Sequence, residues 1–295
     1  MREKPRCLYL AVCLALLCGV GGAGGASPPD APQAAQEAAQ ADDTLEVTFF
    51  NCGKADSILL RQGGHAMLID TATDKTGRGV LARLEALGIT QLDALLITHG
   101  DKDHIGGADR VLAAMPVRAV YVGPHVGDSK QADQFLAALE KKQQPPYTLQ
   151  WGDQLVLGEA HLQVIGPVDD RYTEENDASL VLRVTFGETV FLFTGDAENP
   201  ALTKLMSMPG ADALLRAHVL KVPHHGRAER VSDAFFARVQ PEWAVICCER
   251  GTEDALPDEA VLAGLREVSA QVFITGDGEV TIVSDGKTVR AAQEP

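Results

Sequence analysis

The sequence predicts an α/β (α+β) fold in which two facing β-sheets are flanked by helices. Short β-rich runs alternate with helix-like segments from residue 45 to residue 290, and no Gly/Pro-rich linker interrupts that stretch. The order of elements in the second half repeats the order in the first. With 295 residues, 45% of them hydrophobic, the chain is long enough to bury a full-sized core. We therefore expect one domain over residues 44–295.

The first half is expected to open with an antiparallel meander and then to alternate helices with strands. Three apolar runs are predicted as the strands of the meander, with Gly63-Gly64 as the turn between the last two: 45–50, 57–60 and 66–69. The next segments are predicted as helix, strand, helix, strand and helix: 77–87, 94–98, 107–114, 117–122 and 132–142.

The second half is predicted to follow the same plan. Four apolar runs read as another meander: 154–157, 161–165, 180–186 and 189–193. They precede a predicted helix, strand, helix and strand: 201–206, 219–222, 233–239 and 243–247. This repetition favours two similar halves, each with a sheet covered by its own helices.

The N-terminus has the features of an export signal. Arg2, Lys4 and Arg6 precede an apolar run over residues 8–20, and small residues follow it as far as Ser27, which predicts a signal peptide over residues 1–26. Residues 27–43 contain no bulky apolar side chain and are predicted to be a flexible linker. We expect a secreted or extracytoplasmic protein without a stable membrane domain after cleavage. An uncleaved membrane tether is the alternative.

The remaining cysteines and the net charge exclude some classes of protein. Cys52, Cys247 and Cys248 are the cysteines outside the predicted signal peptide, and an odd number with two adjacent is no disulfide framework. Buried free thiols are expected for the adjacent pair. The formal net charge of -15 does not attract nucleic acid by itself, so a polyanionic substrate would need metal ions and a local basic patch.

The densest group of ligand-type side chains follows the predicted strand 94–98. His99, Asp101, Asp103 and His104 lie within the segment HGDKDHIGG, directly before a predicted helix. Alternate residues of such a loop can point to different sides and so serve two metal ions. Imidazole and carboxylate together suit zinc, manganese or iron. The alternative is a solvated, charged turn capped by aspartates.

Two other predicted strands are also followed by side chains that can bind metal ions. Asp196 ends the apolar run FLFTGD, and His224-His225 follow the run VLKVP. Taken alone, Asp196 is typical of a helix N-cap. Together with the first cluster, these residues predict three strand ends that converge on one edge of the sheets, where active sites usually lie.

In this order, the motifs HxDxDHxGG, TGD and PHHG resemble those of the metallo-β-lactamase superfamily. The closest resemblance is to the extracellular hydrolase domain of ComEC-type competence proteins and their free-standing secreted relatives. Supporting matches are the segments FNCGKADS at 50–57, LID at 68–70 and NDASLVL at 176–182. The resemblance covers about residues 45–284 and implies a four-layer αββα sandwich with metal ions at the edge of the two sheets.

The resemblance also implies a site for two divalent metal ions, zinc or manganese. By position, its ligands are histidines and aspartates: His99 and Asp101 for one ion, Asp103 and His104 for the second, Asp196 between them, and one of His224 and His225. The other histidine of that pair is a candidate proton donor, and Asp103 is the residue best placed to orient the attacking water.

This sequence departs from the superfamily pattern at the third-motif histidine, which has no clear counterpart between His104 and Asp196. His125 follows a predicted strand, whereas His161 lies within one and is expected at the surface. The Asn176-Asp177 element is a candidate for the vacant place. Five residues complete the set of possible site residues: Asp56, Lys102, Asn176, Asp177 and Ser179. The Gly-His-Pro element often found late in ComEC domains is replaced by Ala255-Leu256-Pro257.

A two-metal site favours hydrolysis, because adjacent divalent ions lower the pKa of a bound water toward about 7 and polarise the substrate. Phosphodiesters, in a small molecule or a nucleic acid, fit such a site best, since the cations offset the charge of the transition state. Lys54, Lys102 and Arg227 lie in the motif loops and could assist. One alternative is a lactam or thioester hydrolase, which usually has histidine in place of Asp101. A non-catalytic surface binding protein with the same fold is another. No feature specifies an oligomeric state.

Overall fold

The structure, a computed structural model, describes residues 43–294 apart from 170, 173, 253 and 254. The predicted signal peptide (1–26) and the predicted linker (27–43), except for its last residue, lie outside the described residues. Among the helices that are described, none combines the length and the apolar character needed to cross a bilayer.

The described strands form two mixed sheets. The first contains eight strands in the order β15-β14-β1-β2-β3-β4-β5-β6, and the second contains seven in the order β13-β12-β11-β10-β9-β8-β7. The first sheet comprises β1 (Leu45–Phe49), β2 (Ile58–Gln62), β3 (His65–Ile69), β4 (Leu92–Ile97), β5 (Val117–Val122), β6 (Tyr147–Thr148), β14 (Glu279–Ser284) and β15 (Val289–Glu294). The second comprises β7 (Gln154–Leu157), β8 (Ala160–Gly166), β9 (Val181–Phe186), β10 (Thr189–Phe193), β11 (Val219–Lys221), β12 (Trp243–Ile246) and β13 (Gln271–Ile274).

Each sheet begins antiparallel and continues parallel. In the first, β1, β2 and β3 pair antiparallel, and β3 to β6 pair parallel. In the second, β7 to β10 pair antiparallel, and β10 to β13 pair parallel. Because parallel neighbours need a crossover, helices cover the outer face of each parallel part. The predicted repetition of the two halves is therefore present in the topology.

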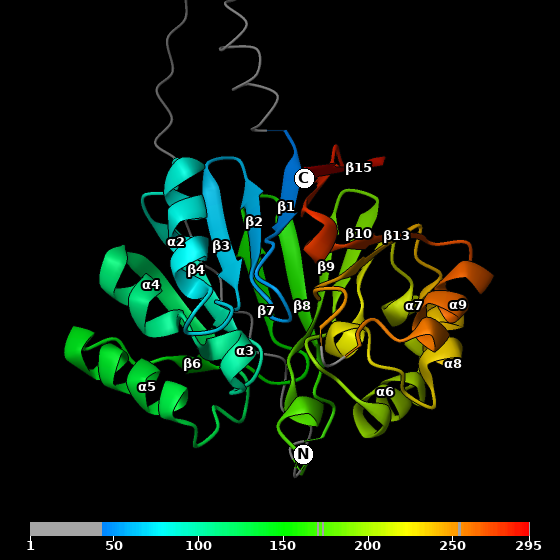
Figure 1. Ribbon diagram of the computed structural model, residues 1–295, viewed down its shortest axis with the longest axis horizontal. Helices are drawn as coiled ribbons and strands as arrows, with labels where there is room; N and C mark the ends of the chain where they lie inside the picture. The colour runs from blue at the N-terminus through cyan, green and yellow to red at the C-terminus, as the bar shows by residue number, and fades with distance from the viewer. Residues whose placement is uncertain (1–42, 170, 173, 253–254, 295) are drawn as a thin grey trace, which may run out of the picture.

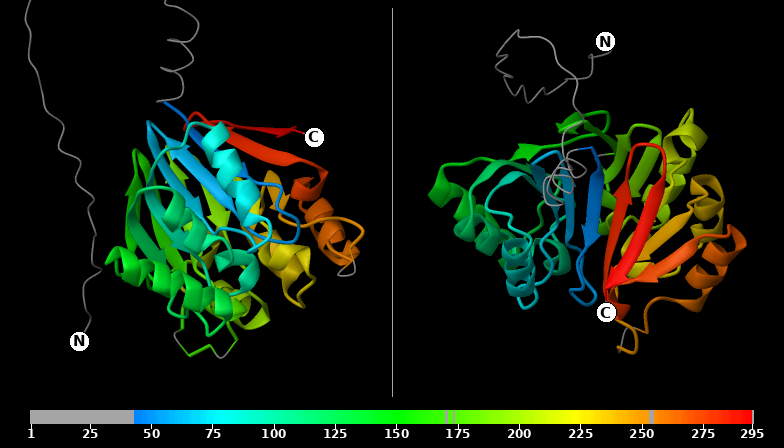
Figure 2. Two further views of the ribbon diagram at one scale, coloured as in Figure 1. Left: turned by 60° about the vertical axis from the view of Figure 1, so that its left-hand side comes forward. Right: turned by 90° about the horizontal axis from the view of Figure 1, so that it is seen from above.

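Helices cover the outer faces of both sheets, and the sheets face each other in the middle of the molecule (Figures 1 and 2). The first sheet is covered by α2 (Gly77–Ala86), α4 (Ala108–Ala114) and α5 (Lys130–Lys142), and the second by α6 (Asn199–Met206), α7 (Ala211–Leu215), α8 (Ser232–Val239) and α9 (Glu259–Glu267). The layers are helix, sheet, sheet and helix, which confirms the predicted α/β sandwich.

Alternation along the strands divides the apolar side chains between the layers. In β10, Phe191 and Phe193 point into the core between the sheets, whereas Val190 and Leu192 point toward the helices. Phe49 of β1 meets Phe193 across that core, with ring centroids 6.1 Å apart. Burial of such rings on both faces stabilises the sandwich by the hydrophobic effect and holds the strand ends at fixed places.

No helix or strand was predicted after residue 247, but the chain continues through α9 and β13 to β15. Strand β14 returns to the first sheet and pairs antiparallel with β1, with Leu45 opposite Ser284. Its apolar residues Val280 and Ile282 are fully buried between the sheets. The last hairpin therefore extends the first sheet from the far end of the chain.

Candidate metal centre

The site is built from loops at one end of the sandwich. The loop after β4 carries His99, Asp101, Asp103 and His104, and its second half forms the short helix α3 (Lys102–Ile105). The N–H groups of His104 and Ile105 both donate to the carbonyl of Asp101, which closes this turn. The loop after β10 carries Asp196, and the loop after β11 carries the histidine pair. The three predicted strand ends therefore meet.

Three histidine side chains are completely buried in the site, and one nitrogen of each is unpartnered. The Nε2 atoms of His99, His104 and His225 lack a hydrogen-bond partner among the described residues. Two of them face the Asp196 carboxylate: His104 Nε2 lies 3.3 Å from Oδ1, and His225 Nε2 lies 3.1 Å from Oδ2. Buried polar atoms without partners are costly, so their convergence indicates a ligand-binding site.

Two aspartates of the first loop complete this group of ligand-type atoms. Asp101 Oδ2 lies 3.7 Å from His99 Nε2, and Asp103 Oδ2 lies 3.5 Å from His225 Nε2. The ligand atoms of His99, His104 and Asp196 lie within 4.8 Å of one another. A set of imidazole nitrogens and carboxylate oxygens without thiolate fits zinc or manganese. The residues present therefore fit the metal ions expected from the sequence.

The opposite ring nitrogens of His104 and His225 are held by hydrogen-bond partners behind the site. His104 Nδ1 lies 2.7 Å from Asp70 Oδ2, and His225 Nδ1 lies 2.8 Å from the carbonyl oxygen of Cys247. Acceptors at Nδ1 place the proton there and leave the lone pair of Nε2 directed into the site. This arrangement is typical of histidines that bind metal ions.

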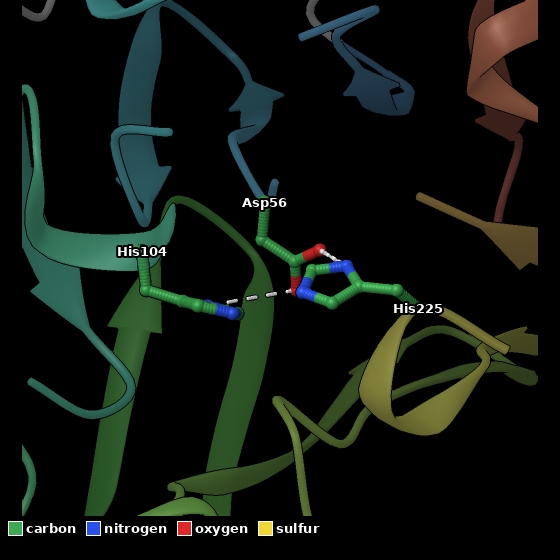
Figure 3. Close-up of side chains that lie close together, drawn as sticks. All are labelled: Asp56, His104 and His225. Carbon is green, nitrogen blue, oxygen red and sulfur yellow. Dashed lines mark ion pairs between the residues drawn. The ribbon is translucent and has the colours of Figure 1, made fainter. Parts of the chain in front are cut away.

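Asp56 lies between His104 and His225, as Figure 3 shows. Its carboxylate oxygens lie 3.8 Å from His104 Nδ1 and 3.5 Å from His225 Nδ1. These three residues are close enough to hold an ion by distance alone. Both Nδ1 atoms already face acceptors, however, and Lys221 contacts Oδ2 of Asp56 at 2.6 Å. Asp56 therefore contacts the Nδ1 side of both histidines and supports the site without being one of its candidate ligands.

Lys221 is a residue of the site that was not predicted from the sequence. It is the last residue of β11 and is fully buried. Its Nζ donates to the carbonyl of Gly195 at 2.7 Å, in addition to contacting Asp56, and lies 3.4 Å from Asp196 Oδ1. Burial by itself lowers the pKa of Lys221, but the charges of Asp56 and Asp196 together raise it above its ordinary value. The signal was a single lysine inside the apolar run 219–222.

Asp196 lies at the point where these charges meet. Burial raises the pKa of its carboxyl, but His225, His104 and Lys221 outweigh this effect and hold the pKa well below its usual range. For Asp103, burial likewise raises the pKa of the carboxyl, but the close contact with His225 and the charge of His104 lower the pKa further than burial raises it. Both side chains are therefore ionised at neutral pH and available as ligands.

The side chains of His224 and His225 point in different directions. His224 and His225 both have positive φ, 46° and 55°, an uncommon conformation for residues with a Cβ and one that often marks functional sites. His225 points into the site, whereas Nδ1 of the half-buried His224 lies 3.1 Å from Glu198 Oε1. Of the two predicted alternatives, His225 is the one whose Nε2 meets the other ligand atoms.

The short helix η1 (Asn176–Ala178) and Ser179 lie beside the site. Asn176 Nδ2 donates to Glu198 Oε1 at 2.8 Å. Asp177 Oδ1 accepts the N–H groups of Glu198 and Ala201, at 3.2 and 3.1 Å, and so caps the N-terminus of α6. Ser179 contacts His99 and Asp196 directly.

Other predicted residues lie further from the ligand atoms. His125 is exposed and lines an acidic hollow of about 430 Å³ together with Asp128, Glu174 and Glu175. His161 is exposed on β8, as expected. Burial and the neighbouring Asp101 raise the pKa of Glu175 to about 7.

The three basic side chains of the motif loops also differ in their exposure and in their contact with the candidate ligands. Lys102 is exposed, whereas Lys54 Nζ lies 3.9 Å from Asp103 Oδ2. Arg227 is half-buried just after the histidine pair. Of the three, Lys54 is therefore the one that contacts a candidate ligand.

Comparison with known proteins agrees with this geometry. Residues 51–249 match the family model of the metallo-beta-lactamase superfamily. The chain is 30% identical over 193 residues to ComE operon protein 3 of Bacillus subtilis (65% of this chain, 24% of that protein). It is 29% identical over 224 residues to competence protein ComA of Neisseria gonorrhoeae (76% and 30%). These matches confirm the resemblance to competence proteins predicted from the motifs, although the chain spans less than a third of either relative.

A solved structure of similar fold is the metallo-beta-lactamase fold protein YhfI from Bacillus subtilis. It superimposes with a TM-score of 0.51 at 14% sequence identity, over 78% of this chain and 96% of that one. At this identity the likeness shows the fold alone.

Proposed function

The chain belongs to the metallo-beta-lactamase superfamily, and from this premise we propose that it is a secreted phosphodiesterase that uses two divalent metal ions. The observation that carries the proposal is the convergence of three buried, unpartnered histidine Nε2 atoms, two of which face the ionised carboxylate of Asp196. A binding protein that had lost catalysis would have no need to keep such a costly arrangement.

We propose the division of ligands between the two ions that the positions of the motifs imply. His99 and Asp101 would hold one ion, and Asp103, His104 and His225 the other, with Asp196 shared between them. When bound, the ions supply Lewis acidity, which activates water and offsets the charge of a phosphoryl group. A structural ion would be enclosed by protein groups, whereas Asp101 is 45% exposed at its side chain and leaves the site open on that side.

The protein's own residues hold water and substrate in place. Asp103 faces the opening with 14% of its side chain exposed, and its ionised carboxylate can accept a hydrogen bond from the attacking water. Lys54, 3.9 Å from Asp103, places a positive charge at the same opening, where it can attract a phosphate oxygen. The buried histidines form a floor without bulk water, which strengthens these interactions.

A phosphodiester is favoured over a lactam by the ligand types. Asp101 stands where lactam hydrolases usually have histidine, and no described histidine replaces the third-motif one beside His99 and Asp196. More oxygen ligands favour harder ions such as manganese, which suit phosphate oxygens. Among phosphodiesters, nucleic acid is a candidate because two relatives are named as a competence protein and a ComE operon protein. The acidic hollow beside Asp101 favours a short strand or a small molecule over a long duplex.

Hydrolysis assays test the proposal. The protein loaded with manganese or zinc should hydrolyse bis(p-nitrophenyl) phosphate and single-stranded DNA but not nitrocefin. Asp103→Asn removes the negative charge at nearly constant volume and should lower kcat by at least about a hundredfold, the usual size of a lost acid–base contribution. Asp133→Asn, on the exposed face of α5, is the matched control and should leave kcat unchanged.

Three outcomes would contradict the proposal. Undiminished phosphodiesterase activity in Asp103→Asn would remove the mechanism, and nitrocefin as the preferred substrate would favour the lactamase alternative. Absence of hydrolysis on all three substrates by the metal-loaded protein would favour a binding protein.

The location is proposed from the sequence of residues 1–26. We expect export followed by cleavage near Ala26. Sequencing the N-terminus of the protein recovered from outside the expressing cells checks this expectation. A chain that still begins at Met1 and sediments with membranes would instead indicate the uncleaved tether.

A further inference from the structure

The loop that ends at Ser179 lies directly beside two of the candidate metal ligands. This loop connects β8 to β9 and passes between the strand ends of the two sheets. The N–H of Leu180 donates to the carbonyl of Thr98 at 3.0 Å, which attaches the loop to the end of β4. Asp177 attaches its other side to the N-terminus of α6. The loop is therefore fixed at both halves of the molecule.

The hydroxyl of Ser179 contacts a candidate ligand from each half. Ser179 Oγ lies 3.2 Å from His99 Nδ1, and it accepts the backbone N–H of Asp196 at 3.1 Å. The side chain is 1% exposed. Close packing leaves little freedom here, because a Cβ on Gly195 would lie 2.8 Å from Cβ of Ser179. One buried hydroxyl thus joins the loop after β4 to the loop after β10.

We propose that Ser179 is a positioning residue that sets His99 and Asp196 at the separation and orientation needed to share a metal ion. This role rests on the proposed function. A serine hydroxyl suits it because its oxygen has two lone pairs, so it can accept from the Asp196 N–H and from His99 Nδ1–H together. The proton at Nδ1 then leaves His99 Nε2 free to bind metal.

The neighbouring Thr98 supports the same tautomer from the other side. Its Oγ1 donates to Asp70 Oδ2 at 2.7 Å and lies 3.1 Å from His99 Nδ1, so its oxygen can accept that proton too. Without Ser179, His99 would retain this contact, but the connection to Asp196 would be lost. We therefore expect a change in metal binding larger than the change in folding.

The test compares two variants that each lose a buried hydroxyl. Ser179→Ala removes the one at the site. Ser284→Ala removes another that also connects the sheets, through a 2.7 Å hydrogen bond to Thr189. Ser284 and Thr189 are both fully buried, and neither residue is near the candidate metal ligands. Metal affinity and stoichiometry are measured by calorimetric titration with manganese and zinc, and Tm is measured on the metal-free proteins.

The expected result is that Ser179→Ala binds at least one ion about tenfold more weakly, the lower end of the effect of losing a partner of a metal-binding histidine. Ser284→Ala should bind both ions as the unmodified protein does. The electron paramagnetic resonance spectrum of bound manganese should change in Ser179→Ala only, because that signal follows the geometry around the ions.

Each of the other possible outcomes would overturn a specific part of the proposal. Equal affinity and equal spectra in both variants would reduce Ser179 to a structural residue, while the two-metal site would stand. An unmodified protein that binds no ion would overturn the metal site and this role with it. If Ser179→Ala does not fold, Ser179→Cys applies the same test, since its thiol is a weaker acceptor of similar size.

Discussion

At the scale of single residues, the site combines a buried cation with a concentration of carboxylates. Lys221 is fully buried, and its partners are Asp56, Asp196 and the carbonyl of Gly195. A lysine in the interior is tolerated only when it is paired and hydrogen-bonded, because the loss of hydration is otherwise too costly. Its positive charge therefore helps to keep Asp196 ionised, and its contacts hold Asp56 and Asp196 in place even before a metal ion binds.

This pairing leads to a prediction on stability. Lys221→Met keeps the length of the side chain but leaves Asp56 buried without its cation, which should lower the free energy of unfolding by about 3–5 kcal/mol. Asp56→Asn combined with Lys221→Met removes both charges and should recover most of that loss. Urea denaturation of the metal-free proteins measures both effects. A double variant as unstable as Lys221→Met would show that packing of the lysine chain matters more than its charge.

At the scale of elements, the strands with the strongest apolar pattern were the most predictable. The predicted ranges 117–122, 154–157 and 189–193 coincide with β5, β7 and β10. Each is an apolar run bounded by turn residues, so local sequence alone defines it. β14 has an equally clear alternation, but its place beside β1 depends on contacts between opposite ends of the chain. The short α3, α7 and β6 carry too few residues for a periodic signal.

The candidate site was predictable to a similar extent and for the same reason. Motif loops at strand ends supplied His99, His104 and Asp196 directly, because ligand-type residues that follow the carboxyl ends of strands gather at one edge of an α/β fold. Lys221 and Asp70 were not assigned roles, since their partners are defined by the assembled fold. Gly100 shows the same dependence: a Cβ there would lie 2.0 Å from the carbonyl oxygen of Val126, a contact that the motif alone does not reveal.

At the scale of the whole molecule, the candidate ligands come from both halves. His99, Asp101, Asp103 and His104 follow a strand of the first sheet, whereas Asp196 and His225 follow strands of the second. Bound ions would therefore connect the two sheets at the end where the loops meet, while Phe49 and Phe193 connect them through the core. Without the ions, the ionised aspartates of the two halves repel one another across the site.

Metal removal should consequently lower the stability of the entire domain. Ligands that bind only the folded state stabilise it by about 4 kcal/mol when their concentration is a thousand times Kd, which corresponds to about 8–16 °C in Tm for a domain of this size. We expect a decrease in Tm of that order when a chelator is added, measured by calorimetry, and recovery when manganese or zinc is restored. Asp196→Asn is the control, because a variant that has lost the shared ligand has less binding energy to lose and its Tm should respond far less to the chelator. A Tm of the unmodified protein that does not respond to chelation, although ions are bound, would contradict this prediction. The ions would then have to bind outside the junction of the two halves. An ion at that junction offsets the repulsion between the carboxylates of the two halves, so its removal must lower the stability.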